Sequence, residues 1–279
     1  MRYTKPITIH VYLLTENHLA LTELTGPTLD AVSLQLPEGV YTTLRTYDRM
    51  RILGLSAHLQ RLADSLARLN KARSLDLTAL RAALRTVLEQ EGLPAARLRI
   101  IAPFESDQVF ISIEPFEGYP AEYYAHGVRC HTTRLTRDRP DAKQTAFIAP
   151  SRHAKVEHGP AIHELLIVDE AGRILEGISS NFFAVLDGTL RTAGEEVLAG
   201  VTRAAVLAEA AKLLPVVFEP IGLADLLRLT EAFITSSSRE VMPVIEIDRR
   251  VIGAGQPGPI TRTLIARYRD YWLQAAELP

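Results

Sequence analysis

The chain of 279 residues contains a single cysteine and no large excess of charge of either sign. Because Cys130 is the only cysteine, an intramolecular disulfide and a metal site built from several cysteines are excluded, and a reducing compartment is expected. Lys and Arg number 31 and Asp and Glu number 33, so the formal net charge is only −2. This balance argues against nucleic acid or an anionic membrane as the main partner.

Long hydrophobic runs are also missing. The apolar stretch over residues 7–14 is interrupted by His10 and is too short to span a bilayer. Since no small-residue cleavage site follows it, we expect neither a signal peptide nor a membrane partner, and we predict a cytoplasmic protein.

Two common kinds of catalytic centre have no motif in this sequence. The histidines are dispersed, without a His-Glu-x-x-His pattern, and no metal site is predicted. The Gly-x-Ser-x-Gly elbow of many serine hydrolases is absent as well, which disfavours a nucleophilic serine.

At roughly 150 residues per domain, the length predicts two domains. Alternating and β-branched residues predict strands over 7–12, 39–47, 97–102 and 109–113. Between them, Ser56 is expected to cap a first amphipathic helix, and a second one ends at Gly92, so that both cover one face of a sheet. Two prolines and a glycine break the pattern over residues 114–120, which places the domain boundary there.

The second half of the chain mixes strands and helices. Strands are predicted over 128–135, 165–169, 182–186 and 231–235, and Asp187-Gly188 is typical of a two-residue hairpin turn. One helix is expected to begin at Thr202, and another closes the chain over 260–276. We therefore predict an α+β or mixed α/β protein, with a small domain over 1–117, a linker over 118–125 and a larger domain over 126–279.

Lysine is scarce, with five residues against 26 arginines. A lysine amine can lose its proton and form an imine, whereas an arginine guanidinium cannot. Four of the lysines have polar or terminal surroundings typical of a solvated surface. Lys143 differs because the apolar residues 145–150 follow it, and we expect it where a polar strand end enters the core.

Several short segments place donors or a carboxylate where a ligand could use them. Gly200-Val201-Thr202-Arg203 opens a predicted helix, where free N–H groups and the helix dipole favour a phosphate. Four hydroxyls end a strand over residues 235–238, Arg61 lies on the first helix, and Glu176 lies at a strand end. Each also has a purely structural interpretation: Thr202 as an N-cap, the hydroxyls as a polar turn, and Arg61 and Glu176 as surface residues.

The order of these segments resembles that of the class IV, or fold type IV, pyridoxal phosphate enzymes, which include branched-chain aminotransferases, D-amino acid aminotransferases and aminodeoxychorismate lyases. The resemblance covers nearly the whole chain beyond the first 35 residues. It is carried by Glu38-Gly39-Val40-Tyr41, His58-Leu59-Gln60-Arg61-Leu62, Lys143, His163-Glu164, residues 176–183, residues 198–203 and residues 233–244. It implies a two-domain fold with a small α/β domain and a larger cofactor-binding domain built on a mixed sheet or barrel.

By this resemblance the cofactor is pyridoxal 5'-phosphate. Lys143 would form the Schiff base and move a proton at the substrate Cα, and Glu176 would pair with the pyridine nitrogen, keeping the ring a strong electron sink. Leu198 would pack on the ring and Ser180 would line the site. The phosphate would be bound by a further set of side chains and amides: Arg61, Val201, Thr202, Ser237 and Ser238.

The substrate residues are less sharply defined. Tyr41, Arg45 and Arg99 match positions near the substrate pocket of branched-chain enzymes, and either arginine could clamp a carboxylate or form a structural salt bridge. The chain departs from the family at three places. Ile148 stands where branched-chain enzymes have a tyrosine. No arginine occurs around residues 102–104, where D-amino acid aminotransferases use one for the substrate carboxylate. Thr42-Thr43 follow Tyr41, where an acidic residue often stands in the family.

The resemblance predicts an enzyme that transfers an amino group between an amino acid and a 2-oxo acid. An aminodeoxychorismate-type lyase that releases pyruvate is the alternative, and a non-catalytic binding protein of the same fold is a third hypothesis. A homodimer is expected, because family members complete each pocket with a loop from the partner's small domain.

Overall fold

In the computed structural model, which describes residues 9–16, 18–71 and 73–279, the chain divides into two compact units. Unit 1 comprises the described part of Met1–Glu117 together with Ala142–Ala149 and Ala275–Pro279. Unit 2 comprises Gly118–Asp141 and Pro150–Gln274. The strand predicted over 7–12 begins at Ile7 and Thr8, which lie outside the described residues. The linker predicted over 118–125 stays a prediction, and the structure places helix α4 (Ala121–His126) in this part of the chain.

Unit 1 is built on a seven-stranded antiparallel sheet of order β17-β4-β3-β5-β6-β1-β2. The strands predicted over 39–47, 97–102 and 109–113 are confirmed. The bounds are β1 His10–Thr15, β2 His18–Leu21, β3 Gly39–Tyr47, β4 Arg51–Leu53, β5 Ala96–Pro103, β6 Val109–Pro115 and β17 Ala276–Glu277.

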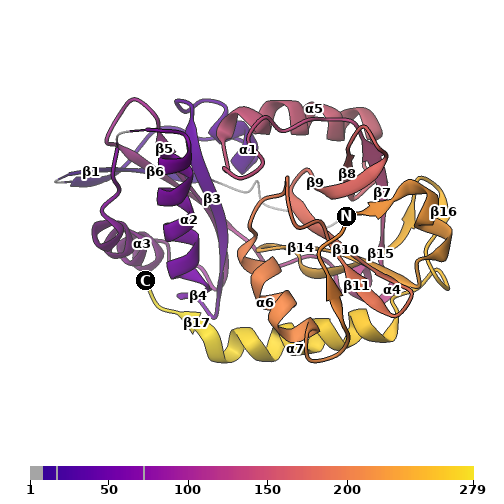
Figure 1. The fold of residues 1–279 in the computed structure, drawn as a ribbon. Coiled ribbons are helices and arrows are strands. Elements are labelled where there is room, and N and C mark those ends of the chain that lie inside the picture. Colours follow the sequence, from indigo (N-terminus) through magenta and orange to yellow (C-terminus); the bar gives the residue numbers. More distant parts are fainter. Residues whose placement is uncertain (1–8, 17, 72) are drawn as a thin grey trace, which may run out of the picture. The chain divides into compact units, whose positions relative to one another are not determined.

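Helices cover both faces of this sheet (Figure 1). Helices α2 (Leu55–Arg68) and α3 (Leu77–Glu91) bury their leucines at helical spacing against β3, β5 and β6. The short helix α1 (Leu29–Ser33), which was not predicted, packs on the other face with a smaller apolar cluster. The sheet is therefore packed against helices on both sides. Strands β5 and β6 are buried along most of their length, whereas alternate residues of β3 are only half-buried.

Of the two predicted ends of these helices, the C-terminal end of α3 is confirmed and the N-cap of α2 is wrong. Gly92 ends α3 in the left-handed conformation, as expected. Ser56 is not the N-cap of α2, because the helix begins one residue earlier, after Gly54 at φ 64°. The Ser56 hydroxyl instead donates to Glu277 Oε2 at 2.5 Å, which fixes the C-terminal strand to this end of the helix.

Unit 2 contains a ten-stranded mixed sheet that closes on itself, because β10 pairs with both β14 and β9. Its strands are β7 Val128–Thr133, β8 Glu164–Val168, β9 Arg173–Gly177, β10 Ser180–Leu186, β11 Thr189–Arg191, β12 Val216–Val217, β13 Ile221–Gly222, β14 Glu231–Ser236, β15 Glu240–Ile247 and β16 Arg250–Val251. Pairs β7–β8, β7–β15 and β11–β12 are parallel and the others antiparallel. The fold prediction of a mixed, barrel-like sheet is confirmed.

The helices of unit 2 differ from the prediction at their starts. Helix α6 (Val201–Ala210) has Gly200 as its N-cap, so Thr202 lies inside the helix and the N-cap interpretation was wrong. Helix α7 (Pro259–Ala275) confirms the closing helix, and Asp187-Gly188 forms the hairpin turn between β10 and β11. Lys143 was expected at a strand end, but it lies in none of the strands of the described structure. A 3-10 turn η1 (Thr145–Phe147) follows it and leads into α5 (Ile148–His158). A second 3-10 segment, η2 (Leu223–Arg228), precedes β14.

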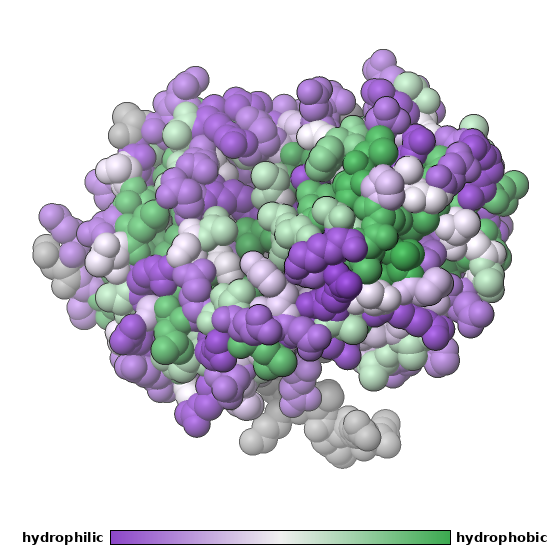
Figure 2. Space-filling view, turned by 60° about the horizontal axis from the view of Figure 1, so that its bottom comes forward, coloured by the Kyte–Doolittle hydropathy of each residue, from purple (hydrophilic) through white to green (hydrophobic). Residues whose placement is uncertain are grey.

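Across the described ranges, no helix combines the length and apolar character needed to cross a membrane. On the face shown in Figure 2, hydrophilic side chains alternate with hydrophobic areas of limited size, the largest at the upper right. The large hydrophobic side chains that stay exposed are dispersed along the chain: Leu21, Leu34, Val156, Phe218, Leu227, Val251, Tyr271, Leu273 and Leu278.

Candidate active site

Backbone contacts to strand β3 and helix α2 fix Lys143 in unit 1. Tyr41 N donates to Lys143 O at 2.8 Å, and Lys143 N donates to Ser65 Oγ at 3.4 Å. The next residues continue this pairing, with a bridge between Val40 and Gln144 and a hydrogen bond from Gly39 N to Thr145 Oγ1 at 2.9 Å. The segment that carries the lysine therefore behaves as an extension of the β3 edge, although it forms no strand of its own.

The aromatic ring of Tyr41 brings together two of the predicted cations. Lys143 Nζ lies 4.7 Å from the ring centroid, and the Arg99 guanidinium lies 5.0 Å from it. Arg99 is nine-tenths buried and is engaged by α1, where its Nη1 donates to Asp30 Oδ1 at 2.7 Å and to Ser33 Oγ at 3.0 Å. Its Nε also donates to Thr43 Oγ1 at 3.2 Å.

Arg45, the other predicted carboxylate clamp, has different surroundings from those of Arg99. Its guanidinium stacks on the rings of Tyr47 and Phe116, at 4.5 and 5.0 Å from their centroids. Alternation along β3 places Tyr41, Thr43 and Arg45 on one face of the sheet.

The opposite face of β3 holds a buried polar group around Arg61. Arg61 Nη2 donates to Thr42 Oγ1 at 2.9 Å, and the Thr42 hydroxyl lies 2.8 Å from His58 Nδ1. Burial, together with the charges of Arg61 and Lys143, holds the pKa of His58 well below its usual value. Thr42 thus links β3 to helix α2 through its hydroxyl.

In unit 2, two hydrogen bonds and an ion pair fix the carboxylate of Glu176 near the end of β9. Asn181 Nδ2 donates to Glu176 Oε2 at 3.1 Å, and Leu198 N donates to the same oxygen at 3.0 Å. Arg137 Nη1 lies 3.3 Å from Glu176 Oε1. The carboxylate is buried, with 3% of the residue exposed, so the surface-acid interpretation of Glu176 was wrong.

The strand register explains why polar side chains gather at Glu176. Asn181 on β10 is the cross-strand partner of Glu176 on β9 and also of Thr235 on β14. Residues directly opposite each other in a sheet point to the same face, so the three side chains form one row. The hydroxyl of Thr235 is buried and has no hydrogen-bond partner among the described residues.

The loop before α6 closes one side of this row. Asn181 Nδ2 also donates to Leu198 O at 2.9 Å, and a Cβ on Gly200 would lie 2.1 Å from Asn181 Oδ1. Glycine at position 200 therefore lets the loop approach the carboxamide closely. In the described structure no side chain caps α6, which leaves the N–H groups of Val201 and Thr202 at a helix start suited to an anion.

The four predicted hydroxyls form the end of β14 and the tight turn into β15. Ser236 pairs with Glu240 across the hairpin, and Ser237 and Ser238 lie in the turn between them. Arg239 N donates to Ser236 Oγ at 3.2 Å, which tightens this turn. The polar-turn interpretation of these hydroxyls is therefore correct for the local structure.

Ser180 contacts a different carboxylate from the one expected. Its hydroxyl donates to Glu164 Oε2 at 3.1 Å, and Ser179 Oγ donates to the same oxygen at 2.6 Å. Arg239 Nη1 lies 3.4 Å from that oxygen. Burial raises the pKa of Glu164, but the charges of Lys155 and Arg239 and the hydrogen bonds from Ser179 and Leu165 outweigh it and lower the pKa to about 2.

The polar residues of unit 2 fit an anionic aromatic group with a ring nitrogen. An open helix start and the buried hydroxyl of Thr235 suit phosphate oxygens, and the fixed Glu176 carboxylate suits a protonated nitrogen. Lys143 supplies an amine in unit 1. The roles of these side chains toward one ligand stay a prediction.

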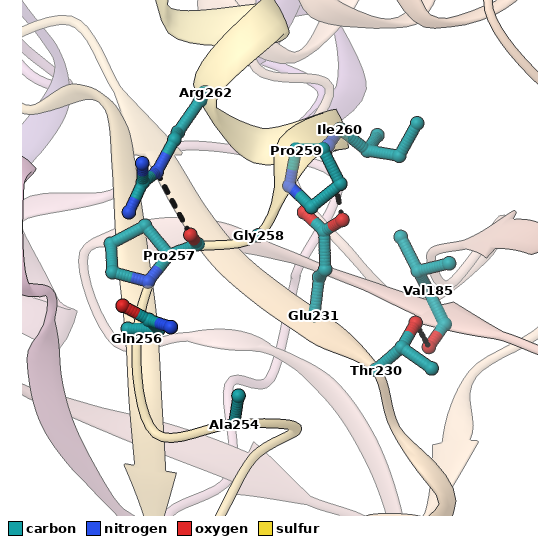
Figure 3. A pocket seen from close by; sticks show the side chains of 10 residues that line it. All are labelled: Val185, Thr230, Glu231, Ala254, Gln256, Pro257, Gly258, Pro259, Ile260 and Arg262. Atoms are coloured by element: carbon teal, nitrogen blue, oxygen red, sulfur yellow. Dashed lines mark hydrogen bonds between the residues drawn. The ribbon is translucent and has the colours of Figure 1, made fainter.

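A cavity of about 600 Å³ lies elsewhere in unit 2, at the start of α7 (Figure 3). Its described lining includes none of the predicted site residues. Glu231, which points toward α7, accepts hydrogen bonds from Ile260 N at 3.0 Å and from Thr261 N and Thr261 Oγ1 at 2.7 Å. These contacts cap the helix and account for the buried acid.

The sequence alone assigned no site role to Asn181, Thr235, Arg137, Glu164 or Arg239. Asn181, Thr235, Glu164 and Arg239 stand inside the quoted motifs, but their contacts depend on strand register and on residues distant in sequence. Arg137 lies outside every quoted motif. A useful signal in the sequence would have been polar residues within or at the ends of strands that are otherwise apolar, because buried polar groups need hydrogen-bond partners.

Residues 39–247 match the family described as Amino-transferase class IV. The branched-chain-amino-acid aminotransferase of Pseudomonas aeruginosa is 29% identical over 257 residues, covering 83% of this chain and 83% of the relative. The crystal structure of the branched-chain aminotransferase from Thermoproteus uzoniensis with norvaline has a TM-score of 0.78 at 26% identity, over 97% of this chain and 99% of the other. The T.th. branched-chain amino acid aminotransferase complexed with N-(5'-phosphopyridoxyl)-L-glutamate has a TM-score of 0.79 at 22% identity, over 94% and 93% of the two chains.

Proposed function

Because this chain belongs to the class IV aminotransferase family and transfers an amino group between an amino acid and a 2-oxo acid, we propose that it does so with pyridoxal 5'-phosphate as its cofactor. The observation that carries the proposal is the geometry around Glu176, whose buried carboxylate is fixed by Asn181, Leu198 and Arg137. A buried carboxylate that is fixed in this way from several elements is suited to orient a ring nitrogen.

When bound, pyridoxal phosphate supplies a carbonyl carbon for the amine and a ring that accepts the electrons of the substrate Cα–H bond. Lys143 Nζ would hold the cofactor covalently and, once displaced by the substrate amine, would take the proton from the substrate Cα. Glu176 would hold the proton on the ring nitrogen, and Leu198 would pack against the ring.

A second set of residues would bind the phosphate. We assign this role to Arg61, to Thr202 with the amides of Val201 and Thr202, and to the turn of Ser237 and Ser238. The position of Arg61 supports the assignment, because its guanidinium lies beside His58 and Thr42 and supplies a positive charge there. Ser180 would act indirectly, since its hydroxyl donates to Glu164.

The substrate carboxylate would be bound on the Tyr41 face of β3. Arg99 and Arg45 both lie on this face, and Arg99 is already fixed by Asp30 and Ser33. An arginine that is preorganised in this way loses little freedom when it binds a carboxylate. We also propose that the protein is a homodimer, on the resemblance to family members that complete each pocket with a partner loop.

The decisive experiment is a titration of the apo-protein with pyridoxal phosphate, followed by incubation with 2-oxoglutarate and a panel of L- and D-amino acids. The panel begins with leucine, isoleucine and valine because the relatives act on branched-chain amino acids by name. We expect stoichiometric binding and formation of glutamate. Absence of binding would refute the proposal. A parallel incubation with aminodeoxychorismate that releases pyruvate, with no glutamate formed from the amino acid panel, would identify a lyase.

The homodimer is tested separately. Light scattering that gives a fully active monomer would refute the dimer.

A further inference from the structure

Two turns of unit 2 carry proposed cofactor residues, and a buried network joins them. The first turn, over residues 177–180, links β9 to β10 and follows Glu176 directly. The second turn, over residues 236–240, links β14 to β15 and contains Ser237 and Ser238. The side chains of residues 163, 164 and 239 form the connection between the two turns.

The guanidinium of Arg239 bridges the turns. Arg239 Nη1 donates to Ser179 Oγ at 3.1 Å and lies 3.4 Å from Glu164 Oε2. Ser179 Oγ in turn donates to Glu164 Oε2 at 2.6 Å, and Ser180 Oγ adds a donor to the same atom. Arg239 thus belongs to one turn by its backbone and contacts the other turn by its side chain.

Further contacts hold both Glu164 and Arg239 in place. Glu164 is fully buried at the start of β8, where its Oε1 accepts from Leu165 N at 3.1 Å. A Cβ on Gly177 would lie 2.2 Å from Ser180 Oγ and 3.0 Å from Glu164 Cγ, so a glycine is needed for this approach. Arg239 Nε donates to His163 Nε2 at 3.1 Å, which fixes the other edge of the guanidinium.

We propose that Arg239 is a positioning residue for cofactor binding: through Glu164 and Ser179 it fixes the phosphate-side turn of Ser237 and Ser238 relative to the hairpin that presents Glu176. The inference rests on the function proposed above. It assigns Arg239 no contact with the cofactor.

The physical reason lies in the shape of the guanidinium. Its planar fork makes directed bonds along two edges at once, whereas a lysine ammonium can satisfy one acceptor group from a flexible stem. With a lysine at this position, the charge beside Glu164 would remain, but the simultaneous contacts to Ser179 and His163 would be lost. The two turns would then hold their polar groups less precisely, and misplacement of binding groups by about 1 Å is enough to weaken a preorganised site strongly.

The test compares Arg239→Lys, Ser179→Ala and the double variant with the wild-type protein. Two quantities are measured: the Kd of the apo-protein for pyridoxal phosphate well below the melting temperature, and the melting temperature of the apo-protein itself. We expect Kd to rise by about tenfold or more in Arg239→Lys, as for other residues that orient a binding group without contacting the ligand themselves. A smaller increase is expected in Ser179→Ala, and the double variant should bind no more weakly than Arg239→Lys alone, because both changes break one link.

Glu231→Gln is the matched control, because Glu231 is another buried carboxylate of unit 2 whose hydrogen bonds go to α7. It should lower the melting temperature and leave Kd unchanged, which is the result that a merely structural role predicts for Arg239 as well. An unchanged Kd in both Arg239→Lys and Ser179→Ala would overturn the positioning role. A wild-type protein that binds no pyridoxal phosphate would instead refute the proposed function, and this inference with it.

Discussion

Lys143 Nζ lies 4.7 Å from the centroid of the Tyr41 ring. The two residues are also joined through the backbone, since Tyr41 N donates to Lys143 O. The same ring contacts the Arg99 guanidinium, which Asp30 and Ser33 hold in place. A single aromatic side chain on β3 therefore orients both the predicted catalytic amine and one of the predicted carboxylate clamps.

Replacement of Tyr41 tests this arrangement. Tyr41→Phe keeps a ring face for both cations, so we expect kcat/KM within about threefold of the wild type. Tyr41→Leu removes the ring and should lower kcat/KM by about tenfold or more, since a cation–π contact is worth about 1 kcal/mol and two are lost. Steady-state kinetics of transamination give both values. Equal loss in the two variants would show that the phenolic hydroxyl, and not the ring face, matters.

Lys143→Ala should abolish transamination while the fold remains. Borohydride reduction of the wild-type protein with pyridoxal phosphate should attach the pyridoxyl group to Lys143, and the variant should show no attachment. The physical reason is that no arginine or hydroxyl can replace an amine that forms an imine. A peptide map that locates the group on Lys71, Lys155 or Lys212 would contradict the assignment, and an unchanged circular dichroism spectrum controls for unfolding.

Local signals were enough to predict several elements of this fold. Gly92 after an amphipathic run and Asp187-Gly188 between apolar runs act over a few residues, and both predictions hold. The start of α2 was missed because Gly54 enters the left-handed region and Ser56 is used by Glu277, at the far end of the chain. Lys143 was expected at a strand end, and its apolar neighbours do not reveal that this segment pairs with β3 at one bridge only and then enters a 3-10 turn.

The candidate site shows the same division between local and long-range information. The order of the motifs along the chain pointed to Glu176. Its carboxylate is buried, which is unusual for a glutamate without a structural or functional role. Its role toward a cofactor stays a prediction. Asn181 and Thr235 become neighbours of Glu176 only through the register of three strands. The Glu164–Arg239 pair requires the start of β8 and the turn between β14 and β15 to meet in space, which no spacing along one chain can specify.

Two histidines with lowered pKa values predict a loss of stability in acid. Burial and the charge of Arg239 lower the pKa of His163 from 6.5 to about 4, and the Arg239 Nε–H needs an unprotonated His163 Nε2 as acceptor. The unfolded chain binds this proton below pH 6.5 and the folded chain does not, so the free energy of unfolding falls as pH drops from 6.5 to 4. His58, whose pKa is also lowered, acts in the same direction.

His163→Gln should flatten this pH dependence, because glutamine offers Arg239 an acceptor that does not titrate. Urea unfolding of both proteins between about pH 4.5 and 7.5 measures the effect, with up to about 3 kcal/mol attributable to His163. His126→Gln is the control, since His126 lies at the end of α4 outside this buried network. Parallel curves for wild type and His163→Gln would show that His163 does not titrate in this range.

Arg61→Ala separates a phosphate-binding arginine from an ordinary helix residue. Loss of a charge-assisted contact to a phosphate dianion should weaken pyridoxal phosphate binding by about 2 kcal/mol, or roughly 30-fold in Kd. Apo-protein stability should change by only about 1 kcal/mol, because the bond from Arg61 Nη2 to Thr42 Oγ1 is lost while Thr42 keeps its contact with His58.

Arg68→Ala is the matched control for Arg61→Ala, since Arg68 is an exposed arginine of the same helix and its removal changes the net charge equally. Its Kd should stay at the wild-type value. Thr202→Ala offers a second probe, because Gly200 and not Thr202 caps α6, so the substitution does not remove a helix cap. Titration with pyridoxal phosphate and melting of each apo-protein give the two quantities. If Arg61→Ala binds the cofactor as tightly as Arg68→Ala does, Arg61 serves only to join helix α2 to Thr42, and the phosphate site must be assigned without it.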